Sequence, residues 1–161
     1  IFTSGTTGGN VKATPIDNTR YIVGFLSQSN AFGINENDNV YISLPLFHSL
    51  PGIVGLGRCI LGGSTMTLAD KFSASRFWID CVRYQCTVAM YIGECCRYLL
   101  AQPQKPEEKQ HKIRMMWGLG MRRDIWKEFQ DRFQIKKIAE FYGSSEGNIN
   151  ICKLFPFVQI L

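Results

Sequence analysis

The sequence has few of the residues from which metal sites are built. Its six cysteines include no C-x-x-C pair, and only His48 and His111 are available to join them. Structural zinc sites need closely spaced thiolates and imidazoles, so no zinc spacing is present. Cys81 and Cys86 fall in apolar segments, which predicts reduced thiols in a buried core. Reduced thiols are typical of a protein that faces the cytosol.

Long apolar runs and a strong excess of charge are also missing. The longest apolar candidate, Gly52 to Gly63, is interrupted by Arg58 and is too short to cross a bilayer. The net charge is +5, and its short basic clusters, Arg122-Arg123 and Lys136-Lys137, are more typical of solvated faces than of a nucleic-acid footprint. We therefore expect neither a membrane span nor a nucleic-acid partner.

An initiator methionine and a signal peptide are absent as well. The 161 residues are 45% hydrophobic and 19% charged, which predicts one globular domain with a real core. Because the chain begins inside a strand-to-loop pattern, we expect it to be an excerpt from a longer chain.

The opening stretch is the most informative part of what is present. Two apolar residues, Ile1 and Phe2, lead into a cluster of hydroxyls and glycines from Thr3 to Gly8, and Lys12 closes it. Glycines let a backbone come close to a ligand, while hydroxyls, amides and a lysine donate to an anion. A flexible linker is the alternative, but it explains neither the apolar lead nor the closing lysine. The stretch favours a phosphate-binding loop, although it is not a Walker loop, because Lys12 is followed by Ala13.

Strand and helix patterns alternate along the rest of the chain. This alternation predicts an α/β fold with a mostly parallel sheet and helices on both faces. We expect strands at 40–43, 65–68, 87–91, 113–117 and 137–142, helices at 18–30, 51–61, 94–101 and 124–133, a further helix capped by Ser73, and a surface loop at 104–112. Open α/β sheets bind ligands beyond the carboxyl ends of their strands, so residues there are the site candidates.

Three such segments carry candidate residues. The first, Leu44 to Ser49, contains His48, which is either a capping or core histidine or a substrate contact. The second, Gly118 to Arg123, follows a strand and has a G-x-G pattern with Glu140 at the distance of a ribose-binding acid. Arg123 replaces the third glycine of the dinucleotide fingerprint, which makes that interpretation weak.

The third segment runs from Tyr142 to Asn148 and follows a predicted strand. Gly143 leaves room for a flat ring, Ser145 is able to donate to a phosphate, and the Glu146 carboxylate is the hard oxygen ligand that Mg²⁺ prefers. Taken alone, these residues are equally typical of an ordinary turn.

Taken together and in this order, the segments resemble the adenylate-forming (AMP-binding) enzyme superfamily. Thr3 to Gly8 match its T-S-G-T-T-G-x-P-K loop without a gap, and Gly9-Asn10-Val11 then stands where the family has two residues. Leu44 to Ser49 resemble its L-P-L-x-H-S segment, and Tyr142 to Glu146 resemble its Y-G-x-T-E motif. Gly118 to Arg122 are similar to the G-N-G-L-R turn of the fatty-acid transport protein and very-long-chain acyl-CoA synthetase family, with Leu119 for asparagine.

The resemblance implies a long-chain or very-long-chain fatty acid–CoA ligase linked to fatty acid uptake. In that reaction a fatty carboxylate attacks the α-phosphate of ATP, and coenzyme A then takes the acyl group; Mg²⁺ accompanies the nucleotide. The implied catalytic residues are His48 at the carboxylate, Ser145 at the α-phosphate and Glu146 at Mg²⁺. The implied nucleotide-binding residues are Thr3, Ser4, Gly5, Thr6, Thr7, Gly8 and Lys12 for the phosphates, and Gly118, Gly120, Tyr142 and Gly143 beside adenine.

The resemblance also implies that residues 1–161 are part of the large N-terminal adenylation domain, without the C-terminal lid domain. The parent protein is then expected to face the cytosol and to associate with the endoplasmic reticulum or plasma membrane through parts outside this chain. The isolated chain is expected to have little ligase activity. A different class remains open, namely a non-catalytic remnant that binds nucleotide or fatty acyl groups.

Overall fold

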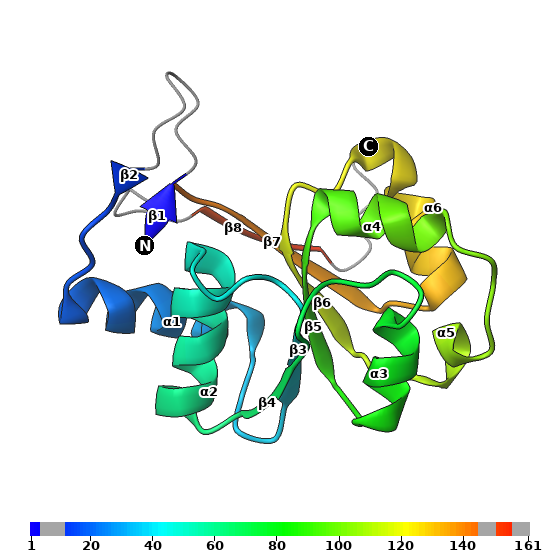
Figure 1. Cartoon of the computed structure of the whole chain (residues 1–161), viewed down its shortest axis with the longest axis horizontal. Coiled ribbons are helices and arrows are strands. Elements are labelled where there is room, and N and C mark those ends of the chain that lie inside the picture. Colours follow the sequence, from blue (N-terminus) through cyan, green and yellow to red (C-terminus); the bar gives the residue numbers. More distant parts are fainter. Residues whose placement is uncertain (4–11, 145–150, 156–161) are drawn as a thin grey trace.

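The computed structural model describes residues 1–3, 12–144 and 151–155. Its centre is a six-stranded sheet in the order β4-β3-β5-β6-β7-β8, of which the first five strands are parallel and β8 is antiparallel to β7 (Figure 1). These strands are β3 (Asn39–Ile42), β4 (Thr65–Leu68), β5 (Val88–Ile92), β6 (Met115–Leu119), β7 (Lys137–Tyr142) and β8 (Ile151–Phe155). A separate antiparallel pair joins β1 (Phe2–Thr3) to β2 (Lys12–Ala13).

Helices cover both faces of the sheet, as the alternating pattern predicts. One face carries α1 (Asn18–Phe32), the π-helical turn η1 (Leu50–Gly55) and α2 (Leu56–Gly62). The other carries α3 (Phe77–Arg83), α4 (Gly93–Leu100), α5 (Glu107–Gln110) and α6 (Arg123–Phe133). Parallel strands need such crossovers, and helices on both faces are what the fold class expects.

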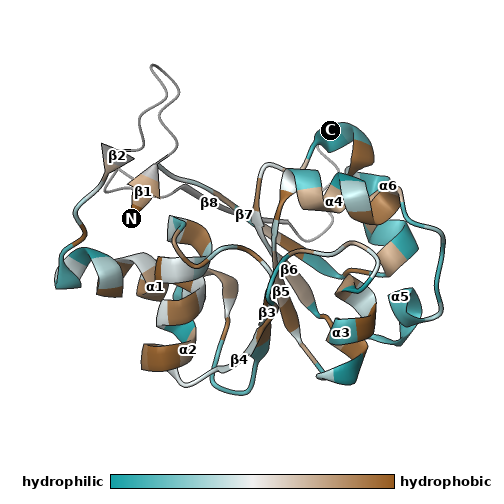
Figure 2. Cartoon of the chain, viewed as in Figure 1, coloured by the Kyte–Doolittle hydropathy of each residue, from teal (hydrophilic) through white to brown (hydrophobic). Residues whose placement is uncertain are grey.

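Two cores lie between these helices and the sheet, because strand side chains alternate between its faces. Figure 2 shows the hydrophobic strands enclosed by the helices, with hydrophilic residues on the outer helix α5. The core under α1 and η1 receives Val40, Ile42, Val88, Met90, Met115 and Trp117. The core under α3, α4 and α6 receives Tyr41, Ala89, Tyr91, Met116 and Ile138.

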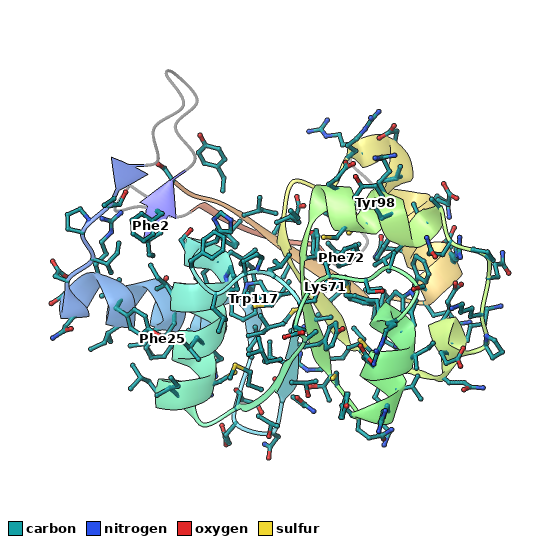
Figure 3. The ribbon with its side chains drawn as sticks, viewed as in Figure 1. Phe2, Phe25, Lys71, Phe72, Tyr98 and Trp117 are labelled. Carbon is teal, nitrogen blue, oxygen red and sulfur yellow. The ribbon has the colours of Figure 1, made fainter. Side chains whose placement is uncertain are left out.

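The side chains of Figure 3 show how the first core is closed. Trp117 of β6 lies between the sheet and α1, where its indole Nε1–H donates to Gln28 Oε1 at 3.1 Å. Gln28 and Trp117 have no exposed surface, so this bond satisfies a donor that would otherwise be buried without a partner. It also ties α1 to the strand that leads into the second candidate segment.

Most predicted elements are confirmed, and the differences have local causes. Asp17 caps α1 by accepting from the Arg20 amide. The expected cap by Ser73 is wrong, because its hydroxyl contacts Ser75 Oγ and α3 begins at Phe77. The expected helix at 51–61 opens instead as the π-helical turn η1.

The predicted surface loop at 104–112 is also wrong in part. It contains α5, in which Glu108 is only 3% exposed. The Arg132 guanidinium holds the Glu108 carboxylate at 3.0 and 2.7 Å. The same guanidinium donates to the carbonyls of Leu100 and Gln102 at 2.6 and 2.7 Å, which joins the end of α4 to α6. A hydrophilic pattern could not reveal this partner, since Arg132 lies more than twenty positions away.

The strand β8 was not predicted, because its residues match no motif. Its pairing with β7 supplies the one antiparallel edge of the described sheet. Where side chains are described, the cysteines are free thiols, at positions 59, 81, 86, 95 and 96. Within the described residues, no helix has the length and apolar character that a membrane span requires.

Candidate nucleotide site at the carboxyl ends of the strands

The predicted phosphate loop is closed by the β1–β2 pair. Thr3 is the backbone partner of Lys12, and the Thr14 amide donates to the Ile1 carbonyl at 2.8 Å. The residues on either side of the predicted loop are therefore paired with each other, and Lys12 directly follows the loop. Ile1 and Phe141 pack against the same core cluster, and Figure 1 shows the pair at the end of β7. The predicted residues Ser4, Gly5, Thr6, Thr7 and Gly8 lie outside the described residues.

The His48 segment follows β3 and is held against η1. The His48 amide donates to the Pro45 carbonyl at 3.1 Å, and the His48 carbonyl accepts from the Gly52 amide at 2.9 Å. A Cβ on Gly52 would lie 2.1 Å from the Leu46 carbonyl oxygen, so only glycine permits this packing. The backbone of the segment is thus fixed from both sides.

The Phe47 and His48 side chains of this segment face outward. Phe47 is 58% exposed, His48 is exposed, and their ring centroids lie 4.4 Å apart. An exposed imidazole beside an exposed aromatic ring is not a core histidine, so a capping histidine and a substrate contact stay the two predictions for His48. The pair is placed to meet a molecule that approaches the carboxyl edge of the sheet.

Tyr142 ends β7 and is 76% exposed. Among the described residues, a tyrosine ring this exposed at a strand end offers an apolar face on which a flat ring can stack. Gly143 follows it, while Ser145 and Glu146 lie outside the described residues. The described residues therefore include the predicted contacts with the base, while the predicted metal ligand lies outside them.

The second segment differs in one respect from the expectation. Gly118 lies inside β6 and not in the turn after it, while Gly120 adopts a left-handed conformation with φ 75°. The turn packs closely on the start of α4, since a Cβ on Gly93 would lie 1.7 Å from the Gly120 carbonyl oxygen. Only a residue without Cβ fits at position 93 without moving this turn.

Glu140 holds the same turn from β7. Its Oε1 accepts the Met121 amide at 2.6 Å. This bond gives Glu140 a role within the protein, in place of the ribose contact that a dinucleotide fingerprint would require. Sequence reasoning weighed Glu140 only for that contact and missed Gly93, whose G-E dipeptide at a helix start carries no distinctive signal.

The strand ends bring some of the predicted residues together. Gly118 of β6 is the register partner of Glu140 of β7, and Tyr142 follows two positions later on the same face of β7. His48 belongs to the segment after β3, which is separated from β6 by β5 in the sheet. Among the described residues, no group of three or more acidic, histidine or cysteine side chains is arranged to hold a metal ion.

Comparisons with known proteins show the family to which the chain belongs. Residues 1–158 match the AMP-binding enzyme family. The chain is 46% identical over 154 residues to human long-chain fatty acid transport protein 1, which covers 96% of this chain and 24% of that protein. It is 48% identical over 149 residues to mouse long-chain fatty acid transport protein 6, covering 92% of this chain and 24% of that protein. The chain thus spans about a quarter of the length of these relatives.

Solved structures confirm the α/β fold. ATP-bound MatB from Rhodopseudomonas palustris superposes with a TM-score of 0.80 at 20% identity, over 95% of this chain and 30% of that one. The o-succinylbenzoate coenzyme A synthetase of Bacillus subtilis, in complex with ATP and magnesium, gives a TM-score of 0.75 at 25% identity, over 94% of this chain and 31% of that one.

Proposed function

The chain belongs to the AMP-binding enzyme family, and on that premise we propose that it is part of an ATP-dependent long-chain or very-long-chain fatty acid–CoA ligase. One observation supports the proposal most. The turn after β6 and the exposed Tyr142 lie at neighbouring strand ends, within a chain 46% identical to a long-chain fatty acid transport protein. The synthetase of Bacillus subtilis with a similar fold binds ATP and magnesium, which supports a nucleotide as the ligand.

In the proposed reaction the fatty carboxylate attacks the α-phosphate of ATP. The bond from the α-phosphorus to the bridging oxygen breaks, pyrophosphate leaves, and an acyl-adenylate remains. The sulfur of coenzyme A then attacks the acyl carbonyl and displaces AMP. The first step depends mainly on orientation and on stabilising charge, so we expect the protein to supply rigid positions for both reactants.

The residues of this chain divide that task. Tyr142, Gly143, Gly118 near the end of β6 and Gly120 in the turn that follows enclose the base. Thr3 to Gly8, with Lys12 at the base of the loop, donate to the phosphates, and Ser145 donates to the α-phosphate. His48 orients the fatty carboxylate beside Phe47. Glu146 would hold Mg²⁺, which would neutralise phosphate charge.

The test is fatty-acid-dependent release of pyrophosphate by the full-length protein that carries this chain. We expect release with ATP and a long-chain fatty acid, none without the acid, and conversion of the adenylate to a thioester on addition of coenzyme A. A purified, folded protein that releases no pyrophosphate with fatty acids of any chain length would contradict the proposal.

A variant at the proposed metal ligand tests the site separately. Glu146→Ala in the full-length protein is expected to lower the adenylation rate about tenfold or more at limiting Mg²⁺, because the hard oxygen ligand is lost. Excess Mg²⁺ should restore part of the rate, and thermal stability should not change. Asp131→Ala, which removes an exposed carboxylate of α6, is the matched control. An unchanged rate for Glu146→Ala at limiting Mg²⁺ would show that Glu146 is only a turn residue.

A further inference from the structure

Three residues form a straight row across the sheet beside the proposed base site. Tyr91 of β5 is the register partner of Gly118 of β6, and Gly118 is the register partner of Glu140 of β7. Register partners in neighbouring strands point to the same face of a sheet. This face is the one covered by α3, α4 and α6, because Tyr91 lies in their core cluster.

Gly118, in the middle of the row, has no side chain, and the Tyr91 ring occupies the space that one would fill. A Cβ on Gly118 would lie 2.8 Å from Tyr91 Cδ1 and 2.1 Å from the Tyr91 carbonyl oxygen. The phenol therefore crosses β6 and donates from Oη to Glu140 Oε1 at 2.9 Å. Burial, followed by the negative charge of Glu140, raises the pKa of Tyr91 well above its usual value, so the phenol remains a donor.

The same carboxylate oxygen accepts the Met121 amide at 2.6 Å. Hydrogen bonds to a charged acceptor are short and about twice as strong as neutral ones. Glu140 thus joins β5 to the end of the turn that follows β6. The turn is also held at Gly120, by its left-handed φ of 75°, and at Met121, whose side chain is only 6% exposed.

Tyr142 completes the arrangement. It lies two positions beyond Glu140 in β7, so both side chains leave the same face of one strand. The strand that carries the exposed ring therefore also carries the group that holds the turn opposite it. A flat ligand needs a constant separation between these two walls.

We propose that Glu140 is a positioning residue for the nucleotide base, holding the turn at Gly120 and Met121 at the spacing from Tyr142 that a purine requires. The inference rests on the proposed function and adds a residue to it. In this proposal Glu140 acts through the turn, because its Oε1 accepts from two protein donors, the Tyr91 phenol and the Met121 amide.

The test compares variants of the full-length protein with two probes, ATP and inorganic tripolyphosphate, which has the phosphates but no base. Glu140→Ala is expected to weaken ATP binding about tenfold, since both hydrogen bonds to the carboxylate are lost. Tripolyphosphate affinity and the KM for fatty acid should stay within about twofold of the parent, because neither contact involves the turn.

Two further variants keep the test decisive if the alanine variant does not fold. Glu140→Gln retains an acceptor oxygen and should keep most of the ATP affinity, whereas Tyr91→Phe removes one donor and should cost about threefold. The ratio of ATP affinity to GTP affinity should be highest in the parent, lower in Tyr91→Phe and lowest in Glu140→Ala, because each variant removes more of the hydrogen bonds that hold the turn.

Several results would overturn the inference. One is an ATP affinity at the parent level in a folded Glu140→Ala protein. Another is an equal loss of affinity for ATP and tripolyphosphate, which would indicate general damage to the binding site. A Glu140→Gln variant as weak as Glu140→Ala would point to a direct contact of the charge with the nucleotide. Failure of the parent protein itself to bind ATP would overturn the proposed function, and this inference with it.

Discussion

Gly93→Ala is expected to weaken ATP binding by about tenfold or more, equal to about 1.4 kcal/mol. The added Cβ would lie 1.7 Å from the Gly120 carbonyl oxygen and 2.9 Å from the Met121 amide nitrogen. Both are backbone atoms, so no side chain can move aside, and the turn must shift as a unit. A shifted turn loses its bond to Glu140 and its spacing from Tyr142. Equilibrium binding of ATP to the full-length variant measures the loss.

Gly33→Ala is the matched control for this effect. Gly33 also needs a glycine-type conformation, with φ 68°, but no heavy atom lies within 4 Å of an added Cβ, and the residue ends α1. Alanine there should cost about 1–2 kcal/mol of stability from the left-handed backbone alone, with no change in ATP affinity. Parent-level affinity in a folded Gly93→Ala protein would show that the turn does not shape the nucleotide site.

Arg132→Met is expected to destabilise the fold by about 3–5 kcal/mol, because it leaves a buried charge without its partner. The Glu108 side chain is only 4% exposed and the Arg132 side chain 14%, so water cannot replace the lost guanidinium. The carbonyls of Leu100 and Gln102 lose their donor at the same time. Urea unfolding at neutral pH measures the change in the free energy of unfolding.

Two variants show whether the buried charge is the cause. Lys127→Met removes an ion pair from the same helix, but both its side chains are more than half exposed, so about 0–1 kcal/mol is expected. The double variant Arg132→Met with Glu108→Met removes both charges and should recover part of the loss. A loss for Arg132→Met no larger than that for Lys127→Met would contradict this account.

The fold was predictable because short apolar strand patterns alternate with helix patterns along the chain. Thr65–Leu68 and Lys137–Tyr142 have the predicted bounds, and Asp17 caps α1 as its residue type suggests. The α5 helix and β8 were not predictable from local pattern. Glu108 is buried because Arg132 of another helix forms an ion pair with it. Ile151–Phe155 forms a strand by pairing with the edge of β7 that faces away from β6.

The candidate site was predictable only where motifs are local. His48 and Tyr142 stand out by their neighbours, and both are exposed in the structure. The row of Tyr91, Gly118 and Glu140 joins three strands over about fifty positions, so no window of sequence contains it. Gly118 illustrates the difference, since the space that a side chain would fill at this position is occupied by Tyr91.

The central claim is that a nucleotide binds between the ends of β6 and β7. Photolabelling of the full-length protein with 8-azido-ATP, followed by trypsin digestion and peptide mapping, tests it most directly. We expect the label on the peptides Met115–Arg122 and Ile138–Lys153, which contain the turn and Tyr142, and its loss when unlabelled ATP competes. Label confined to other peptides, or label on these two that ATP does not displace, would contradict the account.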